Sequence, residues 1–241
     1  MLALTAQTNN IKKLAAATEA LITRAPGAPG AGIISGVSGA GKTTAVAWLA
    51  NRVNVNAVHV RAIRVWTPLT MLESILFNLG IAPNRKCAHM VHQIVEGLAT
   101  TGRSLFVDEA DYLLKRPELV DILRDLHDLS TEPLILIGMA DFLKNLDRWP
   151  QLKGRVGQKV EFLPPDLSDV KEYVATCGEI DLSDDAVEWL HETHGGTMRS
   201  LEVGLEMIER LARKHGLKKV HKADVASVSA PFPVRGRRAA A

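Results

Sequence analysis

A glycine-rich segment in the first fifth of the sequence has the residue types and spacing that phosphate binding requires. It consists of Gly36, Val37, Ser38, Gly39, Ala40, Gly41, Lys42 and Thr43, followed by Thr44. Glycines let backbone N–H groups surround phosphate oxygens closely, and the N-terminus of a following helix attracts the same negative charge. In this pattern the lysine ammonium faces the β- and γ-phosphates, and the threonine hydroxyl faces Mg²⁺. We therefore predict that residues 36–44 bind a nucleoside triphosphate, with Lys42 as a catalytic cation and Thr43 as a metal ligand.

Two adjacent acids, Asp108 and Glu109, follow the apolar run 105–107. An apolar run that ends in acids is typical of a buried strand whose carboxyl end reaches a ligand site. We expect Asp108 to bind the nucleotide and its Mg²⁺, and Glu109 to orient and polarise an attacking water. Alone, the two acids could form a solvated loop after a strand. Their occurrence together with the glycine-rich segment favours nucleotide hydrolysis.

Short apolar segments alternate with helical ones around these two motifs. Strands are expected near 32–35, 56–61, 104–107, 134–138 and 158–162, and helices near 10–24, 43–53, 69–79, 88–99 and 117–128. Apolar strands that alternate with helices form parallel sheets covered on both faces. We predict an α/β fold whose sheet brings the glycine-rich segment and the two acids to the same edge.

The pattern changes after Pro164 and Pro165. Helices are expected near 167–176, 183–194 and 197–215, with no strand among them. The predicted organisation is a nucleotide-binding α/β domain with an N-terminal helix over 1–163, a helical subdomain over 164–228, and a basic tail over 229–241. A polar, charged terminus of this kind is expected to be disordered.

The composition indicates a globular protein in a reducing compartment. Hydrophobic residues make up 46% of the 241 residues and charged residues 23%. No apolar run reaches the roughly 18–20 residues that a membrane-spanning helix needs, so no membrane partner is expected. The N-terminus does not have the order of charges of a signal peptide. Cys87 and Cys177 form neither a disulfide framework nor a metal cluster, so a cytoplasmic location is expected.

The net charge of +2 conceals an asymmetry. Residues 210–241 contain nine Lys or Arg and one acid, so this segment carries +8 and the rest of the chain −6. A basic segment on a mildly acidic body favours a polyanionic partner such as nucleic acid. The alternative is a solvated segment that only improves solubility.

The motifs together resemble those of the AAA+ ATPases. The segments that carry the resemblance are GVSGAGKT, LFVDEAD, LILIG, RVGQKVEF and GGTMRSLE. The chain length and the segment FVDEADYLLKRPELVDILRDLHDLSTEPLILIGM resemble the transposition-helper branch, typified by the phage Mu transposition protein B. The resemblance covers roughly residues 10–215. It implies a P-loop NTPase fold, with a five-stranded parallel sheet in the order 5-1-4-3-2 and a small helical lid, and with ATP and Mg²⁺ as ligands.

The resemblance also implies roles for arginines and a shared site. ATP would lie between neighbouring subunits of a ring or helical filament. Arg199 would contact the γ-phosphate from the lid, and Arg155 would act as the arginine finger on the neighbour's ATP, with Arg148 as the reserve candidate. The sequence departs from the family at Met139, where a polar residue usually follows the fourth strand. Either the alignment shifts there or hydrolysis is slow.

Double-stranded DNA is the polyanion that the resemblance favours. In transposition helpers the loops after the second strand face DNA, which points to Arg85 and Lys86 first and then to Arg61 and Arg64. Such contacts would be made to phosphates and would not depend on sequence. Each basic pair taken singly could instead be a solvated surface.

The interpretation that these observations favour is an ATP-dependent DNA-binding ATPase of a mobile element, encoded by a phage and acting in the host cytoplasm. It would assemble on target DNA and deliver that DNA to a transposase. Three alternatives remain: a helicase loader or replication initiator, a secretion ATPase, and a small-molecule P-loop kinase. The kinase alternative implies a monomer without an arginine finger and without a response to DNA.

Overall fold

The computed structural model describes residue 2, residues 4–52 and residues 55–225 of the 241-residue chain. The described chain forms two compact units. One consists of residues 10–38 and 42–163, and the other of the described parts of residues 1–9, 39–41 and 164–241. We call them the sheet unit and the helical unit. The predicted tail over 229–241 lies outside the described residues.

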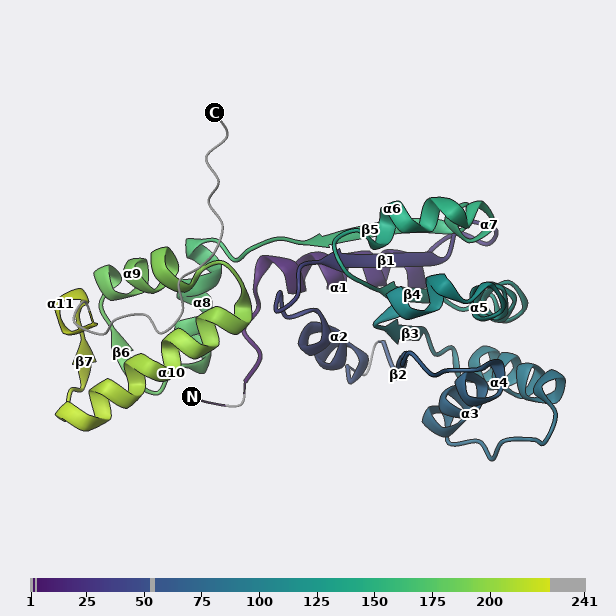
Figure 1. Ribbon diagram of the computed structural model, residues 1–241, viewed down its shortest axis with the longest axis horizontal. Helices are drawn as coiled ribbons and strands as arrows, with labels where there is room; N and C mark the ends of the chain where they lie inside the picture. Colours follow the sequence, from purple (N-terminus) through teal and green to yellow (C-terminus); the bar gives the residue numbers. More distant parts are fainter. Residues whose placement is uncertain (1, 3, 53–54, 226–241) are drawn as a thin grey trace. The chain divides into compact units, whose positions relative to one another are not determined.

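A five-stranded parallel sheet organises the sheet unit (Figure 1). Its strands are β1 (Ala31–Gly36), β2 (Val58–Arg61), β3 (Leu105–Asp108), β4 (Leu134–Ile137) and β5 (Val156–Phe162). Their order is β2-β3-β4-β1-β5, and every neighbouring pair is parallel. The predicted α/β fold with a five-stranded parallel sheet is confirmed, as is the strand order. Strands β1, β3 and β4 are buried along their whole length, which explains why they are apolar rather than alternating.

Helical segments precede and connect these strands. They are α1 (Asn9–Ile22), α2 (Lys42–Ala50), α3 (Pro68–Leu79), α4 (Cys87–Thr101), η1 (Ala110–Lys115), α5 (Pro117–Ser130), α6 (Phe142–Asn145), η2 (Leu146–Arg148) and α7 (Pro150–Lys153). Helices α3, α4 and α5 bury Ile75, Ile94 and Leu123 against one hydrophobic core that β2, β3 and β4 share. Helix α2 packs on β1, β2 and β3 outside this core, directly after the glycine-rich segment. The sheet therefore fixes where α2 begins.

Local signals set the ends of α3, which is followed by the loop 80–86. Thr67 caps the helix, because its side chain accepts the Thr70 N–H while the Thr70 side chain accepts the Thr67 N–H. Gly80 ends it with a left-handed backbone (φ 76°), a conformation that costs glycine little. The loop between α3 and α4 therefore begins at a defined residue, Gly80.

The helical unit contains α8 (Leu167–Cys177), β6 (Asp181–Leu182), α9 (Asp184–His194), α10 (Met198–His215), β7 (Lys219–Val220) and α11 (Lys222–Val225). Its core is made by side chains such as Val170, Leu190, Leu201 and Leu205. The expectation of no strand in this region was wrong, because β6 and β7 form a short parallel pair. Strands of two residues are too short to show a periodic pattern, so only the pairing of distant segments reveals them. None of the described helices is long and apolar enough to cross a membrane.

Candidate nucleotide site and basic surface

The structure brings the two sequence motifs together at one edge of the sheet. Strand β1 ends at Gly36, α2 begins at Lys42, and β3 ends at Asp108. The Thr43 hydroxyl donates a hydrogen bond to Asp108 Oδ2 over 2.7 Å. This contact joins residues 65 positions apart in the chain, and it places the two expected metal ligands side by side.

The loop between β1 and α2 has the backbone that a phosphate cradle needs. Gly39 (φ 79°) and Gly41 (φ 86°) adopt left-handed conformations that side chains with a Cβ rarely take. A Cβ at Gly36 would lie 2.8 Å from the Phe162 carbonyl oxygen. Ala40 is buried, whereas Val37 is exposed. The remaining predicted residues, Ser38 and Thr44, lie in the same loop and in the first turn of α2.

Lys42 is held inside the loop by its own backbone. Its Nζ donates to the carbonyl oxygens of Gly36 (2.7 Å) and Val37 (2.9 Å). Burial lowers the pKa of the Lys42 ammonium, and the charges of Asp108, Glu109 and Asp111 oppose that shift. The Lys42 ammonium is thus one positive charge near three carboxylates. Their negative charge would repel a polyphosphate unless a further cation were bound beside it.

The site fits a divalent cation with oxygen ligands. Mg²⁺ prefers one or two carboxylates together with waters and substrate phosphates, rather than a cage made only of protein ligands. The Thr43 hydroxyl and the almost fully buried Asp108 carboxylate supply donors of this kind. The described residues contain no group of three or more His, Cys, Asp or Glu that could hold a metal alone. Thr43 and Asp108 are therefore the residues that would hold Mg²⁺ next to the phosphates.

Glu109 begins a sharp turn after β3 and is paired with a cation. Its backbone is left-handed (φ 55°, ψ 34°), which is uncommon for a residue with a side chain. Its Oε1 lies 3.3 Å from Nη2 of Arg61. Arg61 ends β2, directly beside Asp108 in the sheet. The sequence suggested Arg61 as a DNA contact, but the structure places it next to the catalytic candidate, because β2 pairs with β3.

Asp111 is a polar residue of this site to which the sequence analysis gave no role. Its Oδ2 accepts a hydrogen bond from the Met139 N–H over 2.7 Å. Burial raises the pKa of the Asp111 carboxyl, and the nearby Glu109 carboxylate adds to that rise. The only sequence signal was its position two residues after Glu109.

The three candidate arginines have different surroundings. Arg155 forms a two-pronged ion pair with Asp128, and its Nη1 donates to the Gln151 carbonyl over 2.6 Å. Hydrogen bonding to Asp128 raises the pKa of the Arg155 guanidinium. Arg148, at the end of η2, is exposed and has no ion pair or hydrogen bond from its side chain to any described residue. In the helical unit, the Arg199 N–H donates to the Gly39 carbonyl over 3.1 Å.

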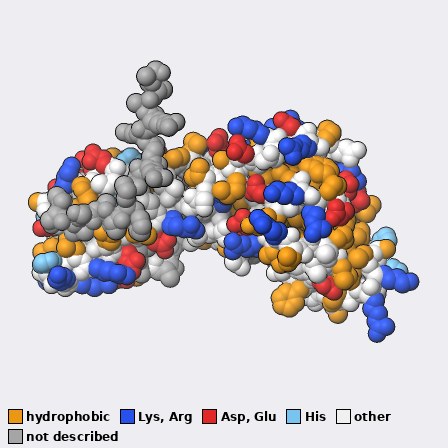
Figure 2. Space-filling view, in the orientation of Figure 1, with side chains coloured by type: hydrophobic (Ala, Val, Ile, Leu, Met, Phe, Trp, Pro, Cys, Tyr) orange, Lys and Arg blue, Asp and Glu red, His pale blue; other side chains and the backbone are white. Residues whose placement is uncertain are grey.

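Arg85 and Lys86 lie in the loop between α3 and α4. Both are exposed, and neither side chain forms an ion pair or hydrogen bond within the described chain. Figure 2 shows Lys and Arg side chains projecting at the place where Figure 1 draws this loop. Arg64 is also exposed, with its guanidinium carbon 6.0 Å from the centre of the Tyr112 ring. Arg85 and Lys86 are therefore free to meet an anionic partner.

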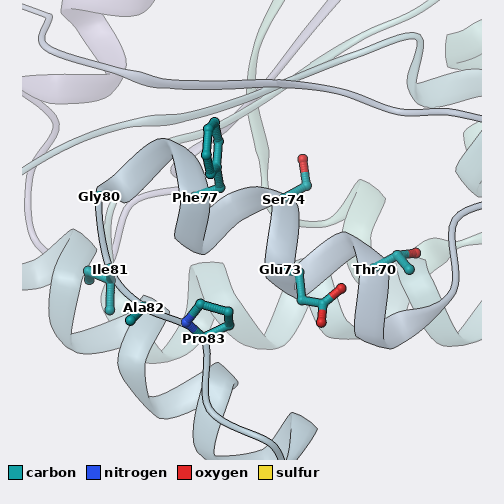
Figure 3. Close-up of a pocket in the computed structure, with 8 residues that line it drawn as sticks. All are labelled: Thr70, Glu73, Ser74, Phe77, Gly80, Ile81, Ala82 and Pro83. Carbon is teal, nitrogen blue, oxygen red and sulfur yellow. The ribbon is translucent and has the colours of Figure 1, made fainter.

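A shallow groove of about 590 Å³ lies beside the same loop (Figure 3). It is lined by Thr70, Glu73, Ser74, Phe77, Gly80, Ile81, Ala82 and Pro83. The Phe77 side chain, which projects from α3 in Figure 3, belongs to a residue that is 83% exposed. The end of α3 and the loop that follows it thus combine an exposed aromatic ring with exposed cations.

The described basic residues near the C-terminus are mostly neutralised. The pairs are Arg210 with Glu206, Arg213 with Glu179 and Glu209, Lys219 with Asp181, and Lys222 with Glu192. Part of the excess positive charge after residue 210 is therefore paired with acidic side chains of the same chain. Arg235, Arg237 and Arg238 lie outside the described residues.

Comparison with known proteins gives a family and a set of similar folds. A family model described as "AAA domain" matches residues 25–146, just over half of the chain. A search of curated proteins finds no match. Among solved structures, the ORC2 protein of Aeropyrum pernix with ADPNP and ADP has a TM-score of 0.72 at 16% identity, covering 92% of this chain and 67% of that one.

Two further structures have the same fold. The ORC1 protein of Aeropyrum pernix in complex with DNA has a TM-score of 0.61 at 19% identity, covering 93% of this chain and 65% of that one. The RuvB Holliday junction branch migration motor of Thermotoga maritima has a TM-score of 0.62 at 19% identity, covering 92% and 68%. This chain therefore spans about two thirds of the length of these structures.

Proposed function

Because this chain belongs to the AAA domain family and is an ATPase, we propose that it binds double-stranded DNA under the control of ATP. The observation that carries the proposal is the loop between α3 and α4. Its Arg85 and Lys86 are exposed and have no partner among the described side chains, in the unit that also contains Lys42 and Asp108. Cations without internal partners lose little when they bind phosphates.

The proposed nucleotide chemistry uses residues that are already in contact. The loop N–H groups and Lys42 bind the phosphates, while Thr43 and Asp108 hold Mg²⁺. Mg²⁺, when bound, neutralises phosphate charge and polarises the γ-phosphate. Glu109 orients the attacking water, and its ion pair with Arg61 holds the carboxylate until the pair is broken. Arg199 from the lid is proposed to contact the γ-phosphate, and an arginine of a neighbouring subunit completes the site.

The finer proposal is a DNA transposition helper. In this role the ATP-bound chain would self-associate into a ring or helical filament on target DNA, and would deliver that DNA to a transposase. The support for this role is the resemblance of the segment after β3 to transposition helpers, together with the exposed basic loop. The absence of sequence readout follows from contacts made only to phosphates.

A replication-initiator or helicase-loader role is the second candidate. The observation that favours it is the fold similarity to the ORC proteins of Aeropyrum pernix, one of which was solved in complex with DNA. The two roles differ in how the protein covers DNA. A transposition helper that forms filaments binds more copies as the duplex lengthens, whereas a loader or initiator binds in a fixed number.

Fluorescence anisotropy of a labelled duplex tests the proposal, with ATP, with ADP and without nucleotide. We expect binding that requires ATP and that falls steeply between about 50 and 200 mM salt. Arg85→Ala combined with Lys86→Ala should weaken binding equally on unrelated sequences and lower the salt slope by about 1–2. Repeating the titration on duplexes of increasing length separates the two candidate roles.

The matched control is Lys12→Ala combined with Lys13→Ala, a neighbouring pair of exposed lysines on α1. This variant should bind DNA as the wild type does. The absence of ATP-dependent binding at low salt would contradict the proposal and leave an ATPase without a DNA partner. Equal losses in both double variants would show that net charge, rather than the α3–α4 loop, determines binding.

A further inference from the structure

Hydrogen bonds hold the loop after β4 to β1 on one side and to η1, which follows β3, on the other. The Gly138 N–H donates to the Ile34 carbonyl of β1 (2.9 Å), and the Met139 N–H donates to Asp111 Oδ2 (2.7 Å). The Met139 carbonyl in turn accepts the Phe142 N–H over 2.9 Å. Because β4 lies between β3 and β1 in the sheet, this loop lies between the turn that carries Glu109 and the loop that carries Lys42.

The side chain of Met139 does not supply a polar group at this position. Met139 is 41% exposed, and a thioether accepts hydrogen bonds only weakly. The polar group that reaches the loop is the Asp111 carboxylate, which comes from η1. The loop after β4 therefore obtains its polar group from the neighbouring strand connection.

The turn at Glu109 is what brings Asp111 to this place. The left-handed backbone of Glu109 (φ 55°) reverses the chain immediately after β3, so that η1 returns toward the end of β4. A non-glycine residue in this conformation costs free energy and persists only where the surroundings hold it. The charges of Lys42 and Glu109 also shift the pKa of the Asp111 carboxyl, so these three side chains interact electrostatically.

We propose that Asp111 is a positioning residue for ATP hydrolysis: it fixes the loop after β4 beside Glu109, and its carboxylate supplies the polar group that Met139 does not. This inference rests on the proposed role of Glu109. Asp111 accepts the Met139 N–H with Oδ2, and an ionised carboxylate has further lone pairs that can accept a hydrogen bond from the water that Glu109 orients. The chain thereby compensates for an apolar residue at the end of β4.

A purely structural role for Asp111 has different consequences. If the carboxylate only joined η1 to the loop after β4, its loss would lower stability and leave kcat unchanged in the folded fraction. A positioning role lowers kcat and leaves nucleotide affinity unchanged, because the hydrogen bonds that hold the Lys42 and Thr43 side chains do not involve Asp111. Comparing the loss of stability with the loss of kcat therefore separates the structural role from the positioning role.

Steady-state hydrolysis by the full chain, with binding of a fluorescent ATP analogue measured alongside, tests the proposal. Asp111→Ala should lower kcat by about tenfold or more while KM and analogue affinity change less than about twofold. Asp111→Asn should be intermediate, because its amide oxygen still accepts the Met139 N–H. The control is Asp141→Ala, which removes an exposed carboxylate paired with Lys144 on the other side of the loop and should leave kcat unchanged.

A second change makes the test independent of stability. Met139→Asn in the Asp111→Ala background places a polar group on the loop itself and should restore kcat by about threefold or more. If Asp111→Ala fails to fold, the comparison of Asp111→Asn with Asp111→Asn plus Met139→Asn carries the same test. A normal kcat in Asp111→Asn and Asp111→Ala, or rescue of stability without rescue of kcat, overturns the proposal.

Glu109→Gln, assayed in parallel, separates this inference from the assignment on which it rests. Stalled hydrolysis in Glu109→Gln with a normal kcat in Asp111→Ala rejects the role of Asp111 alone. Normal hydrolysis in Glu109→Gln rejects the assignment of Glu109 itself.

Discussion

Arg61 illustrates how a single side chain could connect two proposed activities, DNA binding and ATP hydrolysis. It lies at the end of β2, with its guanidinium 3.3 Å from the Glu109 carboxylate, and it remains 64% exposed at the side chain. An exposed ion pair of this kind contributes about 1 kcal/mol or less. The pair is therefore weak enough to be exchanged when another anion, such as a DNA phosphate, approaches Arg61. This geometry connects the proposed DNA surface with the residue proposed to orient water.

Arg61→Ala should raise ATP hydrolysis in the absence of DNA by about two- to fivefold, because the Glu109 carboxylate is no longer held by a cation. The same variant should respond less to added duplex than the wild type does. The measurement is steady-state ATPase activity with and without DNA. The control is Arg116→Ala, which removes an Arg–Glu pair of the same 3.3 Å length that does not involve Glu109. Hydrolysis that does not change in Arg61→Ala would show that the pair does not restrain Glu109.

At the scale of elements, the connection from β4 to α6 depends on close contact. A Cβ at Gly138 would lie 2.4 Å from the Phe142 ring, which is fully buried. No real Cβ atom approaches another atom this closely, so the loop or the ring must move if Gly138 gains a side chain. The same loop presents the Met139 N–H to Asp111. Packing of α6 thus determines the position of a site loop that α6 does not itself enter.

Gly138→Ala should destabilise the protein by about 1–3 kcal/mol, because overpacking forces shifts in a filled core. Chemical denaturation measures this loss. Gly154→Ala is the matched control, since the nearest atom to its added Cβ would be 3.4 Å away, and it should change stability by less than about 0.5 kcal/mol. Equal stability of the two variants would show that the Phe142 ring moves aside without cost.

At the scale of the whole molecule, three buried or partly buried histidines predict a stability that depends on pH. Burial lowers the pKa of His59 on β2, of His127 on α5 and of His194 on α9. The His127 Nδ1 also bonds the Glu132 carbonyl over 2.7 Å. A histidine whose pKa is lowered in the folded state takes up a proton more readily when unfolded. It therefore stabilises the fold above its ordinary pKa of about 6.5, and this stabilisation is lost as pH falls below that value.

The free energy of unfolding should accordingly fall between pH 7.5 and pH 5.5, by at most about 1.4 kcal/mol per pH unit for each histidine. Denaturant titrations across this range measure the change. His127→Gln should make the pH dependence shallower, because one of the three groups no longer titrates. The raised pKa of Asp111 acts in the opposite direction, since a protonated carboxyl is favoured in the fold. A stability that does not vary across this range would contradict the assignment of these histidines.

Assembly into a ring or filament is a proposed property of the whole molecule. Resemblance to the AAA+ family favoured Arg155 as the finger, with Arg148 in reserve. In the structure the Arg155 guanidinium is paired with Asp128, whereas Arg148 has no side-chain partner among the described residues. An arginine that acts on another subunit must be free to leave its own surface. The choice between Arg155 and Arg148 stays a prediction, and Arg148 is tested first because its side chain has no ion pair to break among the described residues. Arg155→Ala is expected mainly to lower stability.

Arg148→Ala subunits should bind ATP and lose hydrolysis by about a thousandfold, as removal of an arginine finger does elsewhere. Mixing them with Glu109→Gln subunits should restore part of the activity. Some interfaces then pair an intact Glu109 with an intact Arg148 from the neighbour. ATPase assays across mixing ratios, with mixed assembly confirmed by a labelled subunit, measure this rescue. Activity that never exceeds that of the separate variants would exclude a site shared between subunits.

The sequence by itself determined the α/β fold, the approximate bounds of the strands, and the position of the glycine-rich loop between the first strand and the helix after it. These features are local or repetitive: a glycine-rich loop is contiguous, and apolar strands alternate with helices at regular intervals. The resemblance supplied the strand order, which the structure confirms. The domain bounds and the roles of individual site residues stay predictions.

Only the tertiary structure decided which side chains meet. Arg61 contacts Glu109 because β2 pairs with β3, and Asp111 reaches Met139 because β4 lies beside β3. Arg155 forms an ion pair with Asp128 because α5 and the segment before β5 lie together. These contacts join residues that are 27 or more positions apart. No local pattern in a sequence specifies such pairs, because they follow from the strand register and from the packing of helices on the sheet.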